Sequence, residues 1–269
     1  MSELQIEFID DNFTVEKSEE YQLLIKQDKL IYQMAILDDE NHLLLLLSWQ
    51  KDTNEDRIQH LLNLSYKSKK IALNSKNILL IPNELYDIDQ EINYLNLLYL
   101  SRTTNTLLTD HLTSLSASLL YGLPTSEIET IQTQFPATQL HSRNTALLCA
   151  WKLFSKEETF FAINFNGEQT DFCYFANGSL MYYHTHPSQH ADELNYFFLA
   201  IVQEQKIDLS GTPLYLSGKI NEQHAFYKRL GKYSKQMQFM DLSSLISCEN
   251  YKVQQKAHNS LSLFGLLCV

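Results

Sequence analysis

The chain has 269 residues, 44% hydrophobic and 20% charged, which is the composition of a folded globular protein with room for one large domain or two lobes. Its 21 Lys and Arg against 32 Asp and Glu leave a net charge of −11, which excludes a nucleic-acid partner on electrostatic grounds. The longest apolar run covers residues 43–47, far short of the ~20 residues that span a bilayer, and residues 1–11 lack the pattern of a signal peptide, so neither membrane insertion nor export is expected.

The first quarter of the chain predicts a β-meander followed by a helix. Three apolar segments separated by short polar turns cover residues 21–25, 30–37 and 42–49. Residues 43–47 are apolar on both faces, so we expect a central strand that is covered on both sides. Thr53 is the expected N-cap of the helix that follows. The later cluster of Lys67, Lys69 and Lys70 is interpreted as a solvated face.

The middle of the chain alternates strands and helices. Strands are expected at 77–81, 107–112, 116–122 and 138–141, and helices at 88–99, 126–135 and 145–154. Ser126 and Glu129 have the spacing of a capping box.

The opening pattern then repeats in the second half. Three strands are expected at 159–164, 170–175 and 179–185, followed by helix 188–205, strand 213–217, a helix from 221 and strand 237–241. Asn177-Gly178, between the second and third of these strands, predicts a type I′ hairpin because both positions tolerate positive φ. Residues 261–267 are apolar enough to predict a buried C-terminal helix. A repeat of more than a hundred residues indicates a duplicated domain rather than a solenoid.

Two βββαβα units in succession are the organisation of the superfamily of actin, sugar kinases and heat-shock chaperones. The segment FFAINFNGEQTDFCYFANGSLMYYHTH resembles the opening of the second lobe in the actin-like proteins of type IV pilus assembly and type II secretion. The whole chain also resembles an uncharacterised bacterial family assigned to this fold. The resemblance implies a two-lobed α/β, actin-like ATPase (ribonuclease H-like) fold. The expected lobes are 1–155, which carries inserted αβ elements, and 156–250, with a C-terminal helix in 251–269 that packs back on the first lobe.

The glycines bear on whether this resemblance extends to ATP. In ATP-using members, Gly-rich turns in both lobes let backbone N–H groups approach the phosphates. All seven glycines of this chain lie at or after Gly122, so the expected first-lobe turn, Lys26-Gln27-Asp28-Lys29, contains none.

The second lobe departs from the ATP-binding pattern at two turns. Its Asp-x-Gly position reads Asn164-Phe165-Asn166 and is followed by Gly167, so a neutral amide replaces the carboxylate that would organise the waters of magnesium. The late Gly-Gly turn reads Ser217-Gly218-Lys219. If weak binding of ATP and magnesium survives, the residues expected to serve it are Asn164, Asn166, Gly167, Gly218 and Lys219. The favoured alternative is that Gly167 and Gly218 only permit tight turns.

His184-Thr185-His186-Pro187 is the strongest metal-like signal, because residues i and i+2 of a strand point the same way. The phrase resembles the motif of zinc deubiquitinase-type metalloproteases, yet the required Ser and Asp positions hold Leu194 and Phe197. The metallo-β-lactamase pattern fails as well, and the four cysteines form no CxxC pair. We therefore expect no metal site.

Catalytic motifs are absent from the sequence. It contains neither GxSxG nor GxxxxGK[ST]. Asp28, Asp110 and Asp171 could each act as a base, but are interpreted as turn or surface acids. No catalytic residue and no cofactor are expected.

The sequence thus favours a non-catalytic interaction or scaffold protein of the cytoplasm that binds a protein partner or self-associates. The main alternative is a divergent ATP-dependent kinase or ATPase of the same superfamily, and the third is a zinc hydrolase that uses His184 and His186. Intact glycine and Asp content in the turns would favour the kinase or ATPase.

Overall fold

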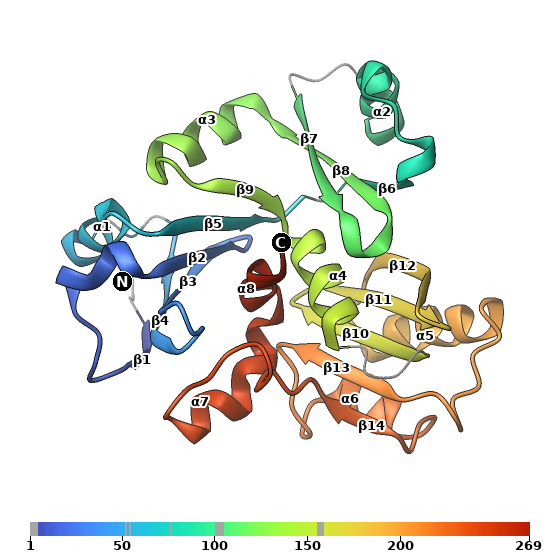
Figure 1. Ribbon diagram of the computed structural model, residues 1–269. Helices are drawn as coiled ribbons and strands as arrows, with labels where there is room; N and C mark the ends of the chain where they lie inside the picture. Colours follow the sequence, from blue (N-terminus) through green and yellow to red (C-terminus); the bar gives the residue numbers. More distant parts are fainter. Residues whose placement is uncertain (1–4, 52, 54, 76, 100–104, 155–158) are drawn as a thin grey trace. The chain divides into compact units, whose positions relative to one another are not determined.

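The structure is a computed structural model that describes residues 5–51, 53, 55–75, 77–99, 105–154 and 159–269. The chain divides into two compact units (Figure 1). The first comprises Met1–Ala150, Leu245–Val253 and Ser262–Val269, and the second comprises Trp151–Ser244 and Gln254–Leu261. The domain boundary expected between residues 155 and 156 lies outside the described residues.

A six-stranded sheet forms the body of the first unit, in the order β1-β4-β3-β2-β5-β9. Its strands are β1 Gln5–Ile9, β2 Gln22–Gln27, β3 Ile31–Leu37, β4 Leu43–Gln50, β5 Ser68–Leu73 and β9 Gln139–Ser142. β2, β3 and β4 form the expected antiparallel meander, while β5 pairs parallel to β2 and β9 parallel to β5. β4 lies between β1 and β3 and buries its five leucines at 43–47, which confirms a strand covered on both faces.

Strand β5 corrects the sequence-based interpretation, which placed its lysines on a solvated surface. Lys69 and Lys70 lie within β5 and are only half-exposed. Each ammonium donates to a backbone oxygen, Lys69 to Leu62 at 3.0 Å and Lys70 to Val269 at 2.6 Å. Burial lowers the pKa of both lysines.

Between β5 and β9 the chain inserts a three-stranded antiparallel sheet of order β6-β8-β7. The strands are β6 Ile78–Pro82, β7 Asn105–Leu112 and β8 Ala117–Pro124, and the helix α2, Glu91–Leu98, lies between β6 and β7 in sequence. A small core of Ile81, Tyr94 and Leu120 joins α2 to this sheet.

The other helices of the first unit are α1 Asp56–Asn63, α3 Thr125–Gln134 and α4 Arg143–Phe154, the last of which contains the boundary between the units. Two expected caps are wrong. The N-caps of α1 and α3 are Glu55 and Pro124 in place of Thr53 and Ser126, and neither makes a side-chain capping bond.

The second unit repeats the strand arrangement of the first. Its five-stranded sheet has the order β12-β11-β10-β13-β14. The elements are β10 Phe160–Asn166, β11 Gln169–Ala176, β12 Ser179–Pro187, α5 Ala191–Glu204, β13 Leu214–Gly218, α6 Ala225–Leu230 and β14 Met237–Phe239. As in β4-β3-β2-β5-β9, an antiparallel meander is followed by two parallel strands. Asn177 and Gly178 have φ of 52° and 72°, which confirms the type I′ hairpin. The shared order confirms the duplicated βββαβα fold.

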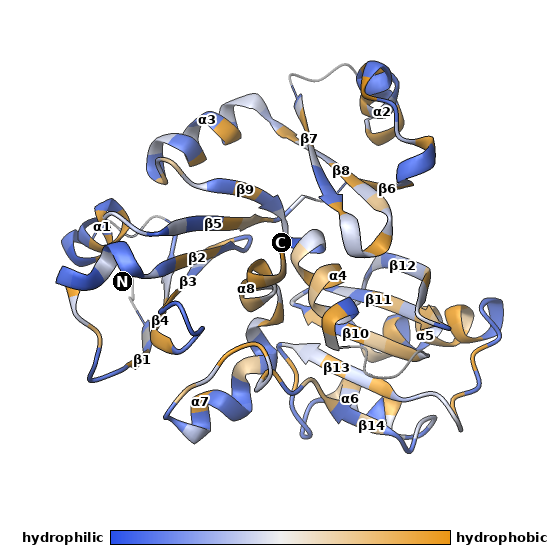
Figure 2. Ribbon diagram, in the orientation of Figure 1, coloured by the Kyte–Doolittle hydropathy of each residue, from blue (hydrophilic) through white to orange (hydrophobic). Residues whose placement is uncertain are grey.

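The chain closes with α7 Tyr251–Lys256, a 3-10 turn, α8 Leu261–Phe264 and a second 3-10 turn Gly265–Cys268. Figure 2 shows α8 as strongly hydrophobic, and Leu263, Phe264 and Leu266 are fully buried, as expected. Residues Ser262–Val269 belong to the first unit. Gly265 is required there, because a Cβ would meet the carbonyl oxygen of Ala146 at 2.3 Å. No helix of the described residues is long and apolar enough to cross a membrane.

Candidate functional site

The residues expected to serve a nucleotide meet at one edge of the second unit's sheet. β10 and β13 are parallel neighbours whose register pairs Asn164 with Ser217 and Phe165 with Gly218. Asn164, Asn166 and Gly167 therefore lie at the carboxyl end of β10, beside Gly218 and Lys219 at the carboxyl end of β13. In open α/β sheets, ligands bind beyond the carboxyl ends of parallel strands. The structure thus brings all five residues to the kind of edge where a ligand would be sought.

The two glycines at this edge have different surroundings. Gly218 has φ +81°, and a Cβ there would lie 2.1 Å from the Phe165 carbonyl oxygen and 2.6 Å from the Phe165 nitrogen. Lys219 N–H donates to that same oxygen at 2.9 Å. Gly218 is thus accounted for by close approach of the chain to β10. Gly167 has φ +65° in the β10–β11 hairpin with nothing within 4 Å of its Cβ position, so its conformation alone favours glycine.

A row of polar side chains crosses this sheet on one face. The Asn164 amide donates to the Asp171 carboxylate at 2.8 Å, and its oxygen accepts from Ser217 Oγ at 3.1 Å. Thr185 Oγ1 also donates to Asp171, at 2.7 Å. Register pairing places the four residues side by side on β12, β11, β10 and β13. Both ends of the Asn164 amide are therefore engaged inside the sheet.

The same row corrects the interpretation of Asp171 as a turn or surface acid. Asp171 lies within β11 and is fully buried. Its hydrogen bonds to Asn164 and Thr185 supply the donors that a buried carboxylate requires. The only sign of this burial in the sequence is that Asp171 stands next to the apolar and aromatic residues 172–175.

The turn at the corresponding place in the first unit is built from side chains. In the β2–β3 turn, the Asp28 carboxylate accepts from Lys29 N–H at 2.8 Å, and Asp28 N–H donates to the Ile31 carbonyl. Gln27 is buried and its amide donates to Glu127 at 3.2 Å. Lys26 is buried as well. The backbone amides of this turn thus contribute to the hairpin, and Asp28 is the expected turn acid.

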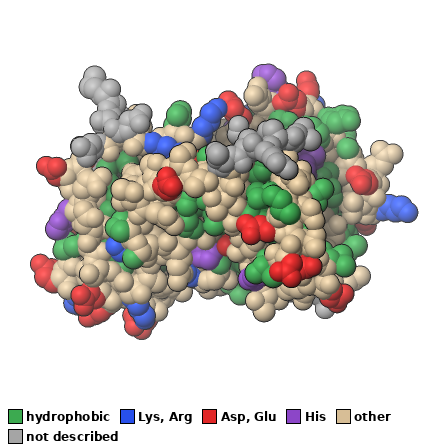
Figure 3. Space-filling view, turned by 90° about the horizontal axis from the view of Figure 1, so that it is seen from above, with side chains coloured by type: hydrophobic (Ala, Val, Ile, Leu, Met, Phe, Trp, Pro, Cys, Tyr) green, Lys and Arg blue, Asp and Glu red, His purple; other side chains and the backbone are tan. Residues whose placement is uncertain are grey.

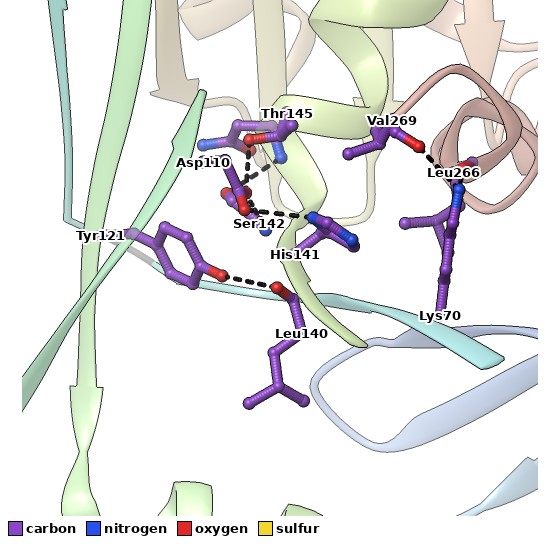
Figure 4. A network of polar contacts seen from close by, with 10 residues as sticks. Lys70, Asp110, Tyr121, Leu140, His141, Ser142, Thr145, Leu266 and Val269 are labelled. Atoms are coloured by element: carbon purple, nitrogen blue, oxygen red, sulfur yellow. Dashed lines mark hydrogen bonds and ion pairs between the residues drawn. The ribbon is translucent and has the colours of Figure 1, made fainter. Parts of the chain in front are cut away.

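Asp110 organises a second buried network, in the first unit (Figure 4). One carboxylate oxygen accepts from Ser142 N–H and from Thr145 Oγ1, both at 2.7 Å, and the other lies 3.1 Å from His141 Nδ1. Asp110 is buried within β7, so its interpretation as a turn or surface acid was wrong.

The role of Asp110 follows from its place at the start of α4. Ser142 precedes Arg143, the first residue of the helix, and a carboxylate beside the first N–H groups is stabilised by the helix dipole. Asp110 therefore acts as a cap supplied by a distant strand. The Nε2 atom of His141 and the Oδ1 atom of Asn144 are buried nearby without a hydrogen-bond partner among the described residues. The network joins the inserted sheet to β9 and α4, and its Thr145 hydroxyl is buried.

The histidine motif on β12 is organised by aromatic packing. His186 Nε2 lies 2.8 Å from the Tyr182 hydroxyl, and its ring stacks on Phe197 with centroids 4.2 Å apart. Burial, with a smaller contribution from His184, lowers the pKa of His186 to about 4, so this imidazole is neutral at physiological pH.

Among the described residues, one group of three side chains could hold a metal ion, and neither His184 nor His186 belongs to it. Asp10, His42 and Glu249, all of the first unit, bring their ligand atoms within 4.8 Å of one another. His42 Nε2 lies 3.4 Å from Asp10 Oδ2, and its Nδ1 lies 3.0 Å from Ser247 Oγ. These three side chains could hold a divalent cation, although Asp10 already accepts two hydrogen bonds from Asn12.

A hollow of about 430 Å³ lies elsewhere in the first unit, beside the α1–β5 loop. Its lining includes Tyr66, Lys67, Lys69 and Pro136. It contains none of the residues expected to serve a nucleotide.

The comparisons with solved structures concern the fold. A Bacteroides thetaiotaomicron protein, described as having an actin-like ATPase fold and unknown function, is 18% identical, with a TM-score of 0.77 over 96% of this chain and 99% of that one. The PilM–PilN type IV pilus biogenesis complex contains a chain that is 11% identical, with a TM-score of 0.61 over 92% of this chain and 98% of that one. These likenesses show an actin-like ATPase fold, as the sequence predicted.

The comparisons with sequences concern the family. No curated protein gave a significant match. A family model described as "Protein of unknown function (DUF3822)" matches residues 10–237, which is most of the chain. The chain therefore belongs to the DUF3822 family.

Proposed function

We propose that this protein is a non-catalytic interaction or scaffold protein built on an actin-like ATPase fold with a degenerate nucleotide site. The observation that carries the proposal is the engagement of Asn164. Its amide donates to Asp171 and accepts from Ser217 within the sheet. A neutral amide lacks the charge to organise hydrated magnesium, and its hydrogen bonds to Asp171 and Ser217 hold it within the sheet.

The β2–β3 turn supports the same proposal. Tight binding of a triphosphate needs backbone N–H groups that approach the phosphates closely, which glycine permits. This turn has no glycine, and its backbone and side chains bond to one another. The loss of two or three charge-assisted hydrogen bonds, at about 1.5–3 kcal/mol each, weakens binding by several powers of ten. The net charge of −11 also opposes a polyanionic ligand.

The proposed role requires a protein partner or self-association. The PilM–PilN neighbour is itself a complex of two proteins, and its fold likeness supports a protein-binding use of this scaffold. The acidic net charge argues against nucleic acid. All four cysteines are free, which fits the reducing cytoplasm as the proposed location.

The second candidate is a divergent ATPase, and one observation favours it. The five expected residues do share the carboxyl edge of β10 and β13, where a ligand would bind. The two proposals differ in what they expect from ATP and magnesium.

Titration calorimetry with ATP and magnesium, together with a phosphate-release assay, tests the proposal. We expect no micromolar binding and no turnover. Lys219→Ala is the site variant, because Lys219 is one of the residues expected to serve a nucleotide. Its side chain is exposed, so its loss should leave the fold intact. A micromolar Kd, or phosphate release that Lys219→Ala reduces, would establish an ATPase and overturn the proposal. Release that is unchanged in Lys219→Ala and that separates from the protein on further purification would identify a contaminating enzyme.

A double variant sharpens the test. Asn164→Asp alone would place two carboxylates within hydrogen-bond distance and should destabilise the second unit. Asn164→Asp with Asp171→Asn restores a single carboxylate and moves it to the β10 position. We expect the double variant to fold and still not hydrolyse ATP, because the glycine-free first-unit turn is unchanged.

A further inference from the structure

The inserted part of the first unit exposes large apolar side chains around α2. Leu85, Ile88, Ile92 and Leu97 are 71%, 73%, 63% and 73% exposed. One such residue would be ordinary, but four within thirteen positions of one segment make this segment a candidate binding surface. We call residues 83–98 the α2 surface.

Helix α2 is more apolar than its own packing requires. Five of its eight residues are hydrophobic, yet only Tyr94 is buried, in the small core with Ile81 and Leu120. A helix that is apolar on most of its faces is normally covered on most of them. Eight residues are also too few for a helix to be stable by itself, so its stability depends on packing. The remaining apolar faces of α2 are therefore available to a partner.

The charges of the α2 surface define that partner. Residues 77–99 contain Glu84, Asp87, Asp89 and Glu91 and no Lys or Arg. All four acids are exposed, and they are interspersed with Leu85, Ile88 and Ile92 in the sequence. Figure 3, which looks down on the side where α2 lies in Figure 1, shows hydrophobic side chains at the surface next to acidic ones. The α2 surface thus combines exposed apolar side chains with exposed acidic ones and has no basic side chain.

We propose that the α2 surface docks an amphipathic helix of a partner protein, whose apolar face is flanked by lysine and arginine. An amphipathic helix matches both properties, because its apolar face covers the exposed isoleucines and leucines while its basic flanks pair with the exposed acidic side chains. A second copy of this chain fits poorly, since two α2 surfaces would oppose four carboxylates to four. This inference rests on the proposed function and names the surface through which the protein acts.

The probe is a pair of synthetic helical peptides of about 16 residues, or four to five turns. Both carry leucines at i, i+3, i+4 and i+7, and they differ only in their flanks, which are lysine and arginine in one and glutamate in the other. Binding to the full chain is followed by fluorescence anisotropy at low and at physiological salt. We expect the basic peptide to bind and the acidic peptide not to bind, with an affinity that falls as salt rises.

Three variants locate the binding. Ile88→Ser with Ile92→Ser removes apolar contact, and Asp87→Asn with Asp89→Asn removes charge. Ile88→Ser with Ile92→Ser should weaken binding of the basic peptide at least tenfold, the size of effect typical of central interface residues. Asp87→Asn with Asp89→Asn should weaken it several-fold and flatten its salt dependence, because exposed charge pairs contribute less. Tyr196→Ser is the matched control, because Tyr196 is 68% exposed on α5 of the second unit, and it should leave binding unchanged. All of these side chains are exposed, so circular dichroism should show unchanged folds.

Three outcomes would overturn the inference. They are failure of the basic peptide to bind, equal binding of both peptides, and equal loss of binding in Tyr196→Ser and in the α2 variants. Sedimentation that shows a dimer dissolved by Ile88→Ser with Ile92→Ser would assign the surface to a second copy instead.

The ATP experiments remain independent of this result. An active ATPase with specific binding at α2 would overturn the non-catalytic role alone, and an inert protein without such binding would overturn the α2 surface alone.

Discussion

Replacing Phe264 by Ala should destabilise the first unit more than any exposed substitution. Phe264 is only 1% exposed and lies in α8, between the fully buried Leu263 and the tightly packed Gly265. Truncating a buried Phe to Ala costs about 3–5 kcal/mol, because the transfer free energy is lost and the cavity collapses only in part. Single domains are stable by about 5–15 kcal/mol, so this one change removes a large share of the free energy of unfolding.

The two tryptophans allow each unit to be followed separately. Trp49 is buried in the first unit and Trp151 in the second, and the two units need not unfold together. In a Trp151→Phe background, fluorescence reports on the first unit through Trp49. A loss of 3–5 kcal/mol should lower the thermal midpoint of that signal by roughly 6–20 °C.

Leu267→Ala is the matched control, since Leu267 follows in the same segment but is only half-buried. It should produce a clearly smaller shift. If Phe264→Ala left the Trp49 transition in urea and on heating where it is in the parent, the C-terminal segment would not be part of the first unit's core.

Two further predictions concern the second unit. Gly218→Ala should destabilise the second unit severely, because the added Cβ would lie 2.1 Å from the Phe165 carbonyl oxygen. Gly167→Ala should lower the free energy of unfolding by only about 1–2 kcal/mol, because only its positive φ is unfavourable for alanine. If urea unfolding showed equal losses of stability in the two variants, the packing role of Gly218 would be wrong. The pH dependence follows from His186, whose pKa burial lowers from 6.5 to about 4 in the folded state. Between about pH 6.5 and 4, His186 is protonated in the unfolded chain but not in the folded one. The free energy of unfolding therefore decreases as the pH drops from about 6.5 toward 4. His186→Gln should reduce that fall in urea midpoints, and an unchanged pH profile would show that His186 does not contribute.

Most strands along the chain and the hairpin turn at Asn177-Gly178 were predictable from the sequence because their signals are local. Apolar runs divided by polar turns predicted both meanders, and the Asn177-Gly178 dipeptide predicted a turn whose two φ angles are indeed positive. The apolar C-terminal segment predicted its own burial, since Leu263 and Phe264 have no favourable alternative in water. The resemblance to actin-like proteins added the fold, which these patterns alone did not specify.

Partners distant in the sequence were decided only by the tertiary structure. Strand β5 was not predicted, because its lysines were interpreted as a solvated surface. In the structure the Lys70 ammonium donates to the carbonyl oxygen of Leu266, 196 residues away. Asp110 and Asp171 were interpreted as surface acids because the sequence does not show which groups donate to them. In the structure Thr145 donates to Asp110 and Asn164 donates to Asp171, and these hydrogen bonds stabilise the buried carboxylates.

The exposure of the apolar side chains of α2 could not be predicted from the sequence either. Hydrophobic periodicity does not distinguish a side chain that packs on its own sheet from one that stays exposed. Hydrophobic period and turn chemistry act over a few residues and can be read directly from the sequence. The satisfaction of buried charge and the covering of apolar surface depend on which segments the fold brings together.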